Sequence, residues 1–198
     1  MKRIILFMIL TTTIPVYGQD WGLGVRIGDP VGLTIKKYTE ENALELSIGG
    51  AHLFYDKRLY DKHLHNWYMA QTLGYKGFEY SINKASVPFG FQIHYLYLKN
   101  LSETTTALQW YYGYGAQFRI QRASYNFRYK ISNDPDWHYL TGETVTDLDI
   151  GGDVVLGMEY SPPNTPVSLF LDLTLFMEVA DDPFIFLVQG GVGLRYKF

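Results

Sequence analysis

Apolar and polar residues alternate along most of the chain beyond residue 20. In the last segment, 186–198, the even positions carry Phe, Val, Leu and Tyr, whereas the odd positions include Gln189, Arg195 and Lys197. A period of two is typical of a strand whose two faces lie in different surroundings. The same test predicts eight strands, at residues 21–28, 31–38, 43–53, 89–99, 106–121, 148–160, 167–179 and 186–198.

Charge distinguishes the two faces of these predicted strands. One face is wide and apolar, and the other carries a charged residue on nearly every strand. A soluble sandwich or lipocalin-like barrel would bury its apolar set inside, where shapes vary and a charge is costly, whereas a membrane barrel turns a wide apolar face with almost no small polar residue to lipid. The pattern therefore favours an all-β, eight-stranded antiparallel up-and-down transmembrane β-barrel. The residues predicted to form a polar network in its lumen are Arg26, Lys36, Glu45, Arg119, Asp149, Asp153, Glu159, Asp172, Glu178 and Arg195.

The predicted lumen is small and its charges nearly balance. Eight strands enclose a space just wide enough for side chains to fill. With Lys197 included, this space receives five bases and six acids, which favours ion pairing over an open channel. Aspartate in place of Val192 or Leu194, on the lipid-facing side, should then cost more than Arg195→Gln, because a polar lumen can rehydrate the lost charge.

The connections between strands fall into two groups. An even strand count puts both chain ends on the periplasmic side, with short turns there and longer loops outside. The connections expected in the periplasm, 39–42, 100–105 and 161–166, are short. The long connections, 54–88 and 122–147, both fall on the other side and are predicted to be aromatic-rich extracellular loops. They suit contact with a protein or glycan partner, or equally packing on themselves.

The N-terminal residues predict export. Lys2 and Arg3 precede a short apolar stretch at 4–10, and small residues before Gln19 suit a cleavage site. We expect residues 1–18 to be a cleaved signal peptide and 19–198 to form the barrel domain. The apolar stretch is too short for a spanning helix, which needs about 20 residues.

Composition narrows the chemistry. The chain has 17 Tyr, 12 Phe and 19 Gly, no cysteine, and a net charge of −3. Without cysteine, a disulfide framework and a zinc–thiolate site are excluded. The acidic balance argues against binding to nucleic acid.

Candidate catalytic and metal-binding residues are few. His63 and His65 lie near acidic residues in the first long connection, but a solvated loop explains them more simply than a metal site. His94 is followed by Tyr95-Leu96, so the His-x-Ser pairing of outer-membrane lipid A deacylases is absent. We therefore expect no catalytic residue, metal or cofactor. A lipid-modifying hydrolase or acyltransferase stays as the first alternative and a narrow transport barrel as the second.

Two short stretches resemble known exported proteins. Leu194-Arg195-Tyr196-Lys197-Phe198 resembles the terminal signal that the barrel assembly machinery of Gram-negative bacteria recognises. The eight-strand plan resembles the small OmpA/OmpX-like barrels, and the segment 28–34 with 42–45 is similar to an uncharacterised set of exported barrels. The resemblance implies insertion into outer-membrane lipid, with Leu194, Tyr196 and Phe198 as the assembly signal. The leading interpretation is a non-enzymatic outer-membrane barrel whose loops contact a partner or support the envelope.

Overall fold

The computed structural model describes residues 20–51, 57–71, 78–85, 89–101, 107–180 and 183–198, without the side chains of 57–63, 78–85 and Ala123. The predicted signal peptide lies outside the described residues. The described elements are one helix and nine strands. They are β1 (Trp21–Gly28), β2 (Val31–Tyr38), β3 (Asn42–Gly50), α2 (Lys57–Ala70), β4 (Phe78–Ala85), β5 (Phe89–Asn100), β6 (Leu108–Tyr129), β7 (His138–Tyr160), β8 (Val167–Glu178) and β9 (Phe186–Lys197).

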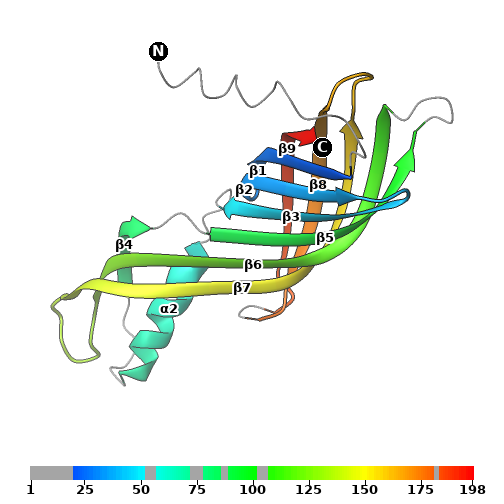
Figure 1. Cartoon of the computed structure of the whole chain (residues 1–198). Helices are drawn as coiled ribbons and strands as arrows, with labels where there is room; N and C mark the ends of the chain where they lie inside the picture. Colours follow the sequence, from blue (N-terminus) through cyan, green and yellow to red (C-terminus); the bar gives the residue numbers. More distant parts are fainter. Residues whose placement is uncertain (1–19, 52–56, 72–77, 86–88, 102–106, 181–182) are drawn as a thin grey trace, which may run out of the picture.

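Eight of these strands close into a barrel (Figure 1). Around the ring the order is β1, β2, β3, β5, β6, β7, β8 and β9, and β9 pairs with β1 again. Each neighbouring pair is antiparallel. The remaining strand, β4, pairs with β6 outside the ring. The predicted eight-stranded up-and-down barrel is confirmed.

The wall of the barrel is apolar outside and polar inside. On β8, Leu171 and Leu173 are 58% and 60% exposed, whereas Asp172 and Thr174 between them are 4% and 1% exposed. Because successive strand residues point to opposite faces, this contrast means that charged groups line the lumen and aliphatic groups cover the outer wall. This is the arrangement of a transmembrane barrel. In the described residues, no helix is long and apolar enough to cross a membrane.

The two ends of the barrel differ. The described part of the chain begins and ends at one end of the barrel, here called the terminal end, where the backbone of Phe198 exchanges hydrogen bonds with that of Trp21 at 3.2 and 2.8 Å. The turns after β2 and β7 at this end are short. At the opposite end, here called the far end, β6 and β7 continue well beyond their neighbours (Figure 1).

The far end carries a second folded unit, here called the platform. It consists of β4, the β6 residues 122–129, the β7 residues 138–146 and helix α2. The loop interpretation of 54–88 and 122–147 was therefore wrong in part. The first range contains α2 and β4, and in the second range the two strands leave only 130–137 between them. Strand β6 continues through residues 125–129, where large aromatic residues alternate with polar ones.

Candidate functional sites in the lumen and on the platform

The largest ion-pair cluster in the lumen is centred on Glu159. Its two carboxylate oxygens receive Lys36 Nζ and Lys197 Nζ at 2.9 Å each, and Arg195 Nη1 at 3.2 Å. The Tyr38 hydroxyl donates a further hydrogen bond at 2.6 Å. Three cations on one buried carboxylate leave positive charge to be neutralised by another group.

Glu45 supplies that second negative charge. Its carboxylate bonds to Arg195 Nη2 and lies 3.9 Å from Lys36 Nζ. Arg195 and Lys36 are completely buried, so each depends on these carboxylates for compensation. The Arg195 guanidinium also stacks 3.6 Å above the centre of the Phe170 ring, which adds a cation–π contact.

A separate pair links β1 to β8 across the lumen. Arg26 holds Asp172 through both guanidinium nitrogens, at 2.5 and 2.8 Å. Strand β9 lies between β1 and β8, and its Gly191 lies next to this guanidinium. A Cβ at Gly191 would lie 2.1 Å from Arg26 Cζ. The glycine therefore provides the space that the bidentate pair occupies.

Two further pairs lie nearer the far end. Arg119 Nη2 approaches Asp149 at 2.9 Å, and these side chains keep 13% and 20% of their exposure. His94 Nε2 lies 3.1 Å from Asp153 Oδ1, both deeply buried. Glu178 is also buried. The structure thus places all ten proposed lumen residues on the inner side of the wall, and nine of them, all but Glu178, take part in the ion pairs described above.

Sequence reasoning missed some lumen groups. Asp29 was assigned to a far-end loop, yet its side chain is buried and accepts a hydrogen bond from the Gln189 amide at 3.4 Å. Tyr111 is also buried, with its ring 4.3 Å from Lys36 Nζ. The alternation along β6 places Tyr111 on the inner face, so its position in the lumen could have been predicted from the sequence. Its contact with Lys36 could not. Asp29 lies past the end of its strand, where parity gives no signal.

The residues proposed as an assembly signal lie at the terminal end of the wall. Leu194 and Phe198 are 46% and 40% exposed on the outer face, and Tyr196 is half-buried beside them. They lie on β9 and just beyond it, next to the β1 seam that closes the barrel. Their role in assembly stays a prediction.

The platform has an apolar core of its own. Leu64 from α2 packs with Tyr125 and Phe127 from β6 and with Val145 from β7. The Trp67 ring meets the Phe127 ring edge-on at 4.8 Å. Burial and the nearby Glu143 carboxylate raise the pKa of the Tyr125 hydroxyl to about 12. The helix is therefore packed onto the sheet by aromatic side chains.

The tip of the platform presents aromatic and charged groups together. Two cations lie over the Trp137 ring, with Arg128 Cζ at 4.4 Å and Lys130 Nζ at 5.0 Å from its centre. Tyr139 is 70% exposed. The backbone amide of Asp136 and the His138 ring hold the pKa of Asp134 below its usual value. Such a mixture can bind a partner by stacking and charge.

The histidines proposed as metal ligands are not assembled into a site that the structure describes. His65 lies exposed on α2, while the side chain of His63 is outside the described residues. Among the described residues, no three His, Asp or Glu side chains are grouped to hold a metal ion.

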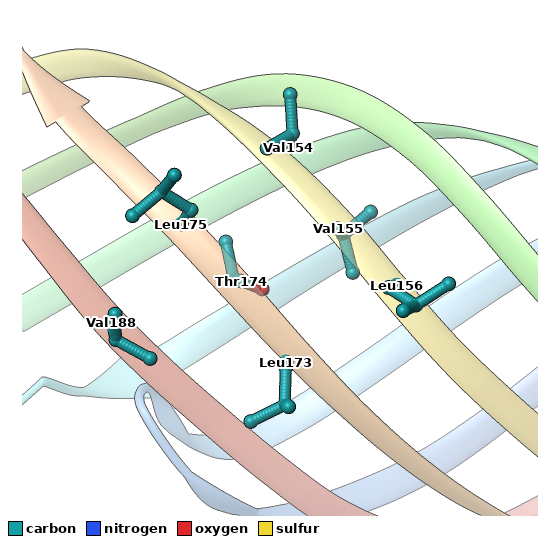
Figure 2. A pocket seen from close by; sticks show the side chains of 7 residues that line it. All are labelled: Val154, Val155, Leu156, Leu173, Thr174, Leu175 and Val188. Atoms are coloured by element: carbon teal, nitrogen blue, oxygen red, sulfur yellow. The ribbon is translucent and has the colours of Figure 1, made fainter.

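A shallow depression of about 230 Å³ lies on the wall between β7 and β8 (Figure 2). Its lining is apolar except for Thr174, and it includes the exposed Leu156, Leu173 and Val188. The surface is one that an acyl chain can cover. It offers no convergent polar groups for a catalytic site.

These features define a class of protein: a small closed β-barrel with an apolar outer wall, a lumen lined with charged groups and a folded unit at one end. The plan is the one expected from the likeness to small OmpA/OmpX-like barrels.

No family model and no curated protein matches the chain. Among solved structures, Ail, the attachment invasion locus protein of Yersinia pestis, is 9% identical with a TM-score of 0.44, over 90% of this chain and 93% of its own. The N-terminal β-barrel domain of Pseudomonas aeruginosa OprF is 12% identical with a TM-score of 0.44, over 90% and 95%. Neither likeness assigns a family or a role.

Proposed function

We propose that this chain is an integral outer-membrane protein whose platform is a non-enzymatic recognition surface outside the cell. The observation that carries the proposal is the platform's own core, formed by α2 and the projecting parts of β6 and β7. An ordered unit of this kind holds its surface groups in fixed positions, which lowers the entropic cost of binding. The exposed Tyr139 and the Trp137 ring with its two cations are the groups we expect to meet a protein or glycan partner.

The lumen contributes stability in this proposal. The clusters around Glu159 and Asp172 place ion pairs in the lumen, and the Lys36–Glu159 pair joins opposite strands of the ring, β2 and β7. They support a plugged lumen over the transport alternative. In planar bilayers, the purified barrel should show no steady large conductance at neutral pH, and well-resolved open-channel currents would favour transport instead.

The hydrolase alternative requires Ser, His and an acid at a lipid-facing rim. The histidine–acid pair formed by His94 and Asp153 lies inside the lumen with both side chains buried. This position gives the alternative no support, because a lipid substrate approaches from outside the wall.

The orientation in the membrane can be tested by cysteine labelling, because the chain itself contains no cysteine. Tyr139→Cys on the platform should react with a membrane-impermeant maleimide on intact cells. The control Glu40→Cys, in the exposed turn at the terminal end, should react only after the outer membrane is opened. Labelling of the control but not of Tyr139→Cys on intact cells would reverse the proposed orientation.

The partner itself can be sought with a photo-crosslinking amino acid at position 139 in intact cells. The matched control places the same amino acid at Leu156, on the lipid-facing wall. A defined adduct at 139 and not at 156 supports recognition by the platform. Equal or absent adducts at both positions would argue that the platform only braces the barrel.

A further inference from the structure

The carboxylate of Asp153, on the inner face of β7, differs in its surroundings from two other carboxylates of the lumen. Asp172 is held by Arg26, and Asp149 by Arg119. Among the residues that the structure describes, no Lys or Arg lies within ion-pair distance of Asp153, and neither of its oxygens accepts a hydrogen bond. Its side chain is nevertheless 0% exposed. A buried carboxylate of this kind is costly unless a cation compensates its charge.

The nearest polar group to this carboxylate is the ring of His94 on β5. His94 Nε2 lies 3.1 Å from Asp153 Oδ1, but the two atoms are not hydrogen-bonded to each other. On the platform, His138 and Asp134 make a contact of nearly the same length, 2.9 Å, and that contact is a hydrogen bond. A neutral imidazole and a carboxylate can instead both direct a lone pair at a third group. The geometry of the lumen pair is of this second kind.

A glycine provides the space in which the two side chains meet. Gly115 on β6 pairs in register with His94 on one side and with Asp153 on the other. A Cβ at Gly115 would lie 2.5 Å from His94 Cδ2 and 2.9 Å from Asp153 Oδ1. The imidazole and the carboxylate therefore approach each other over the backbone of the strand that separates them.

Two glutamines beside this pair have further buried polar atoms. Gln117 is the next inner residue on β6 after Gly115, and it pairs in register with Gln92 on β5. Gln117 is 2% exposed, and neither atom of its amide group has a hydrogen-bond partner. The amide oxygen of Gln92 also has none. Buried amides normally have partners, and amide and carboxylate oxygens are groups that bind cations.

We propose that His94 and Asp153 bind a divalent transition-metal ion, with zinc as the model, in the half of the lumen nearer the far end. Zinc binds imidazole nitrogen and carboxylate oxygen at ~2.0–2.2 Å. Two atoms 3.1 Å apart can both lie ~2.1 Å from one ion, at an angle of roughly 95°. The Gln117 amide oxygen and water complete the coordination. The ion compensates the charge of Asp153 and joins β5 to β7 across β6.

The imidazole decides which class of metal fits the site. Magnesium and calcium prefer ligand sets made of oxygen alone, whereas imidazole suits zinc, nickel and copper. An ion can approach from the far end, where Arg119 and Asp149 keep 13% and 20% of their exposure. Asp149 precedes Asp153 by four residues on β7, which corresponds to roughly 10 Å along the barrel axis. The site therefore requires no passage through the whole lumen, and it does not depend on a partner for the platform.

Titration calorimetry of the folded chain in zwitterionic micelles, prepared without a histidine tag, tests the site directly. The unmodified chain should bind zinc, and Asp153→Asn and His94→Gln should each weaken that binding on the order of tenfold or more. The matched control His138→Gln, in the hydrogen-bonded pair on the platform, should leave it unchanged. Heat-modifiable mobility on gels checks that each variant folds. The absence of zinc binding, or binding that both lumen variants keep, would overturn the proposal.

Urea unfolding separates the metal site from a simple ion pair. Asp153→Asn keeps the size of the side chain and removes its charge, so without metal this variant should be at least as stable as the unmodified chain. Zinc should raise the urea midpoint of the unmodified chain only, and magnesium at the same concentration should raise neither. An ion pair between a protonated His94 and Asp153 predicts the opposite result, a lower midpoint for Asp153→Asn and no effect of zinc, and this result would contradict the proposal.

A third measurement needs no variant, so it holds even where a substitution prevents folding. Paramagnetic cobalt, used in place of zinc in the unmodified chain, should shift or broaden the NMR amide signals of Gly115 and Gly151 and leave that of His138 unchanged. Effects on the platform alone would place the ion elsewhere and exclude the lumen site. None of these results bears on recognition by the platform, so this proposal can fail while the proposed function holds.

Discussion

The barrel and the platform share strands but have opposite polarity. On β6, the face that points into the lumen carries Arg119, and the same face beyond the barrel carries Phe127 in the platform core. The outer face changes in the reverse direction, from the half-exposed Ile120 to the charged Arg128. Both changes occur between residues 120 and 125. The strand is continuous there, and odd-numbered residues stay on the inner face throughout.

This inversion follows from the surroundings of each part. Within the membrane the outer face meets hydrocarbon, so apolar groups lie outside and polar groups pair with each other inside. Beyond the membrane the outer face meets water, and the inner face is covered by α2 and becomes an ordinary apolar core. The pattern of one strand thus marks where the lipid ends.

The largest effect is expected from Arg195→Gln in the lumen. The change removes the nearest cation from the buried Glu45, which keeps the Thr34 hydroxyl at 3.2 Å and Lys36 Nζ at 3.9 Å, and it takes a cation from Glu159. Breaking a buried ion pair typically costs about 3–5 kcal/mol. The contacts of Arg195 therefore reverse the ranking expected from the sequence, in which this change was mild. Urea unfolding in lipid vesicles measures the loss, with the exposed Lys37→Gln as control, and equal midpoints would contradict the prediction.

In the platform, Phe127→Ala should lower local stability by about 3 kcal/mol, because it leaves a cavity beneath Trp67. The barrel should keep its unfolding midpoint, since the cavity lies outside the ring. Hydrogen exchange of α2 amides reports the local loss. Tyr139→Ala, on an exposed side chain, should leave this exchange unchanged. Loss of barrel stability in Phe127→Ala would show that the two units fold as one.

A new charge on the outer face of β7 should separate the two environments. Leu156→Asp places a carboxylate on the lipid-facing wall, at a cost of about 2 kcal/mol. Thr144→Asp lies on the same strand and the same outward face, but in the platform, where water solvates the charge. It should leave stability nearly unchanged. Unfolding in vesicles ranks the stability of the two variants. A greater loss for Thr144→Asp would mean that lipid surrounds the platform and not the barrel.

The smallest effect concerns the tip of the platform. The pKa of Asp134 is lowered first by the Asp136 amide and then by His138. A lowered folded-state pKa means that the stabilising contribution is complete above the ordinary value of 3.8 and is lost as the pH falls through the lowered pKa. NMR titration should show the Asp134 carboxyl titrating below 3.8, and His138→Ala should move it part of the way back. Titration at or above 3.8 in the unmodified chain would contradict the contact.

The strand pattern located most of the barrel because parity is a local property. β1 and β2 begin and end at the predicted residues, since an abrupt loss of alternation bounds both. β7 begins ten residues before its predicted start, because its polarity inverts where it enters the platform. Helix α2 was missed because its apolar face is narrow, with Leu64 and Trp67 among many polar residues. β4 was missed because its only described sheet partner is β6, whose paired residues lie 38 to 51 positions further along the chain.

The sequence by itself determined the polarity of each face, and with it the number of strands in the ring and the set of charges inside. These follow from single side chains and the period of two. Only the tertiary structure decided which charges meet, because partners such as Lys36 and Glu159 lie more than a hundred residues apart. It likewise decided that Arg195 has two carboxylates to compensate. The physical reason is that burial against a face is a property of one strand, whereas pairing depends on the tilt and register that closure imposes on all eight.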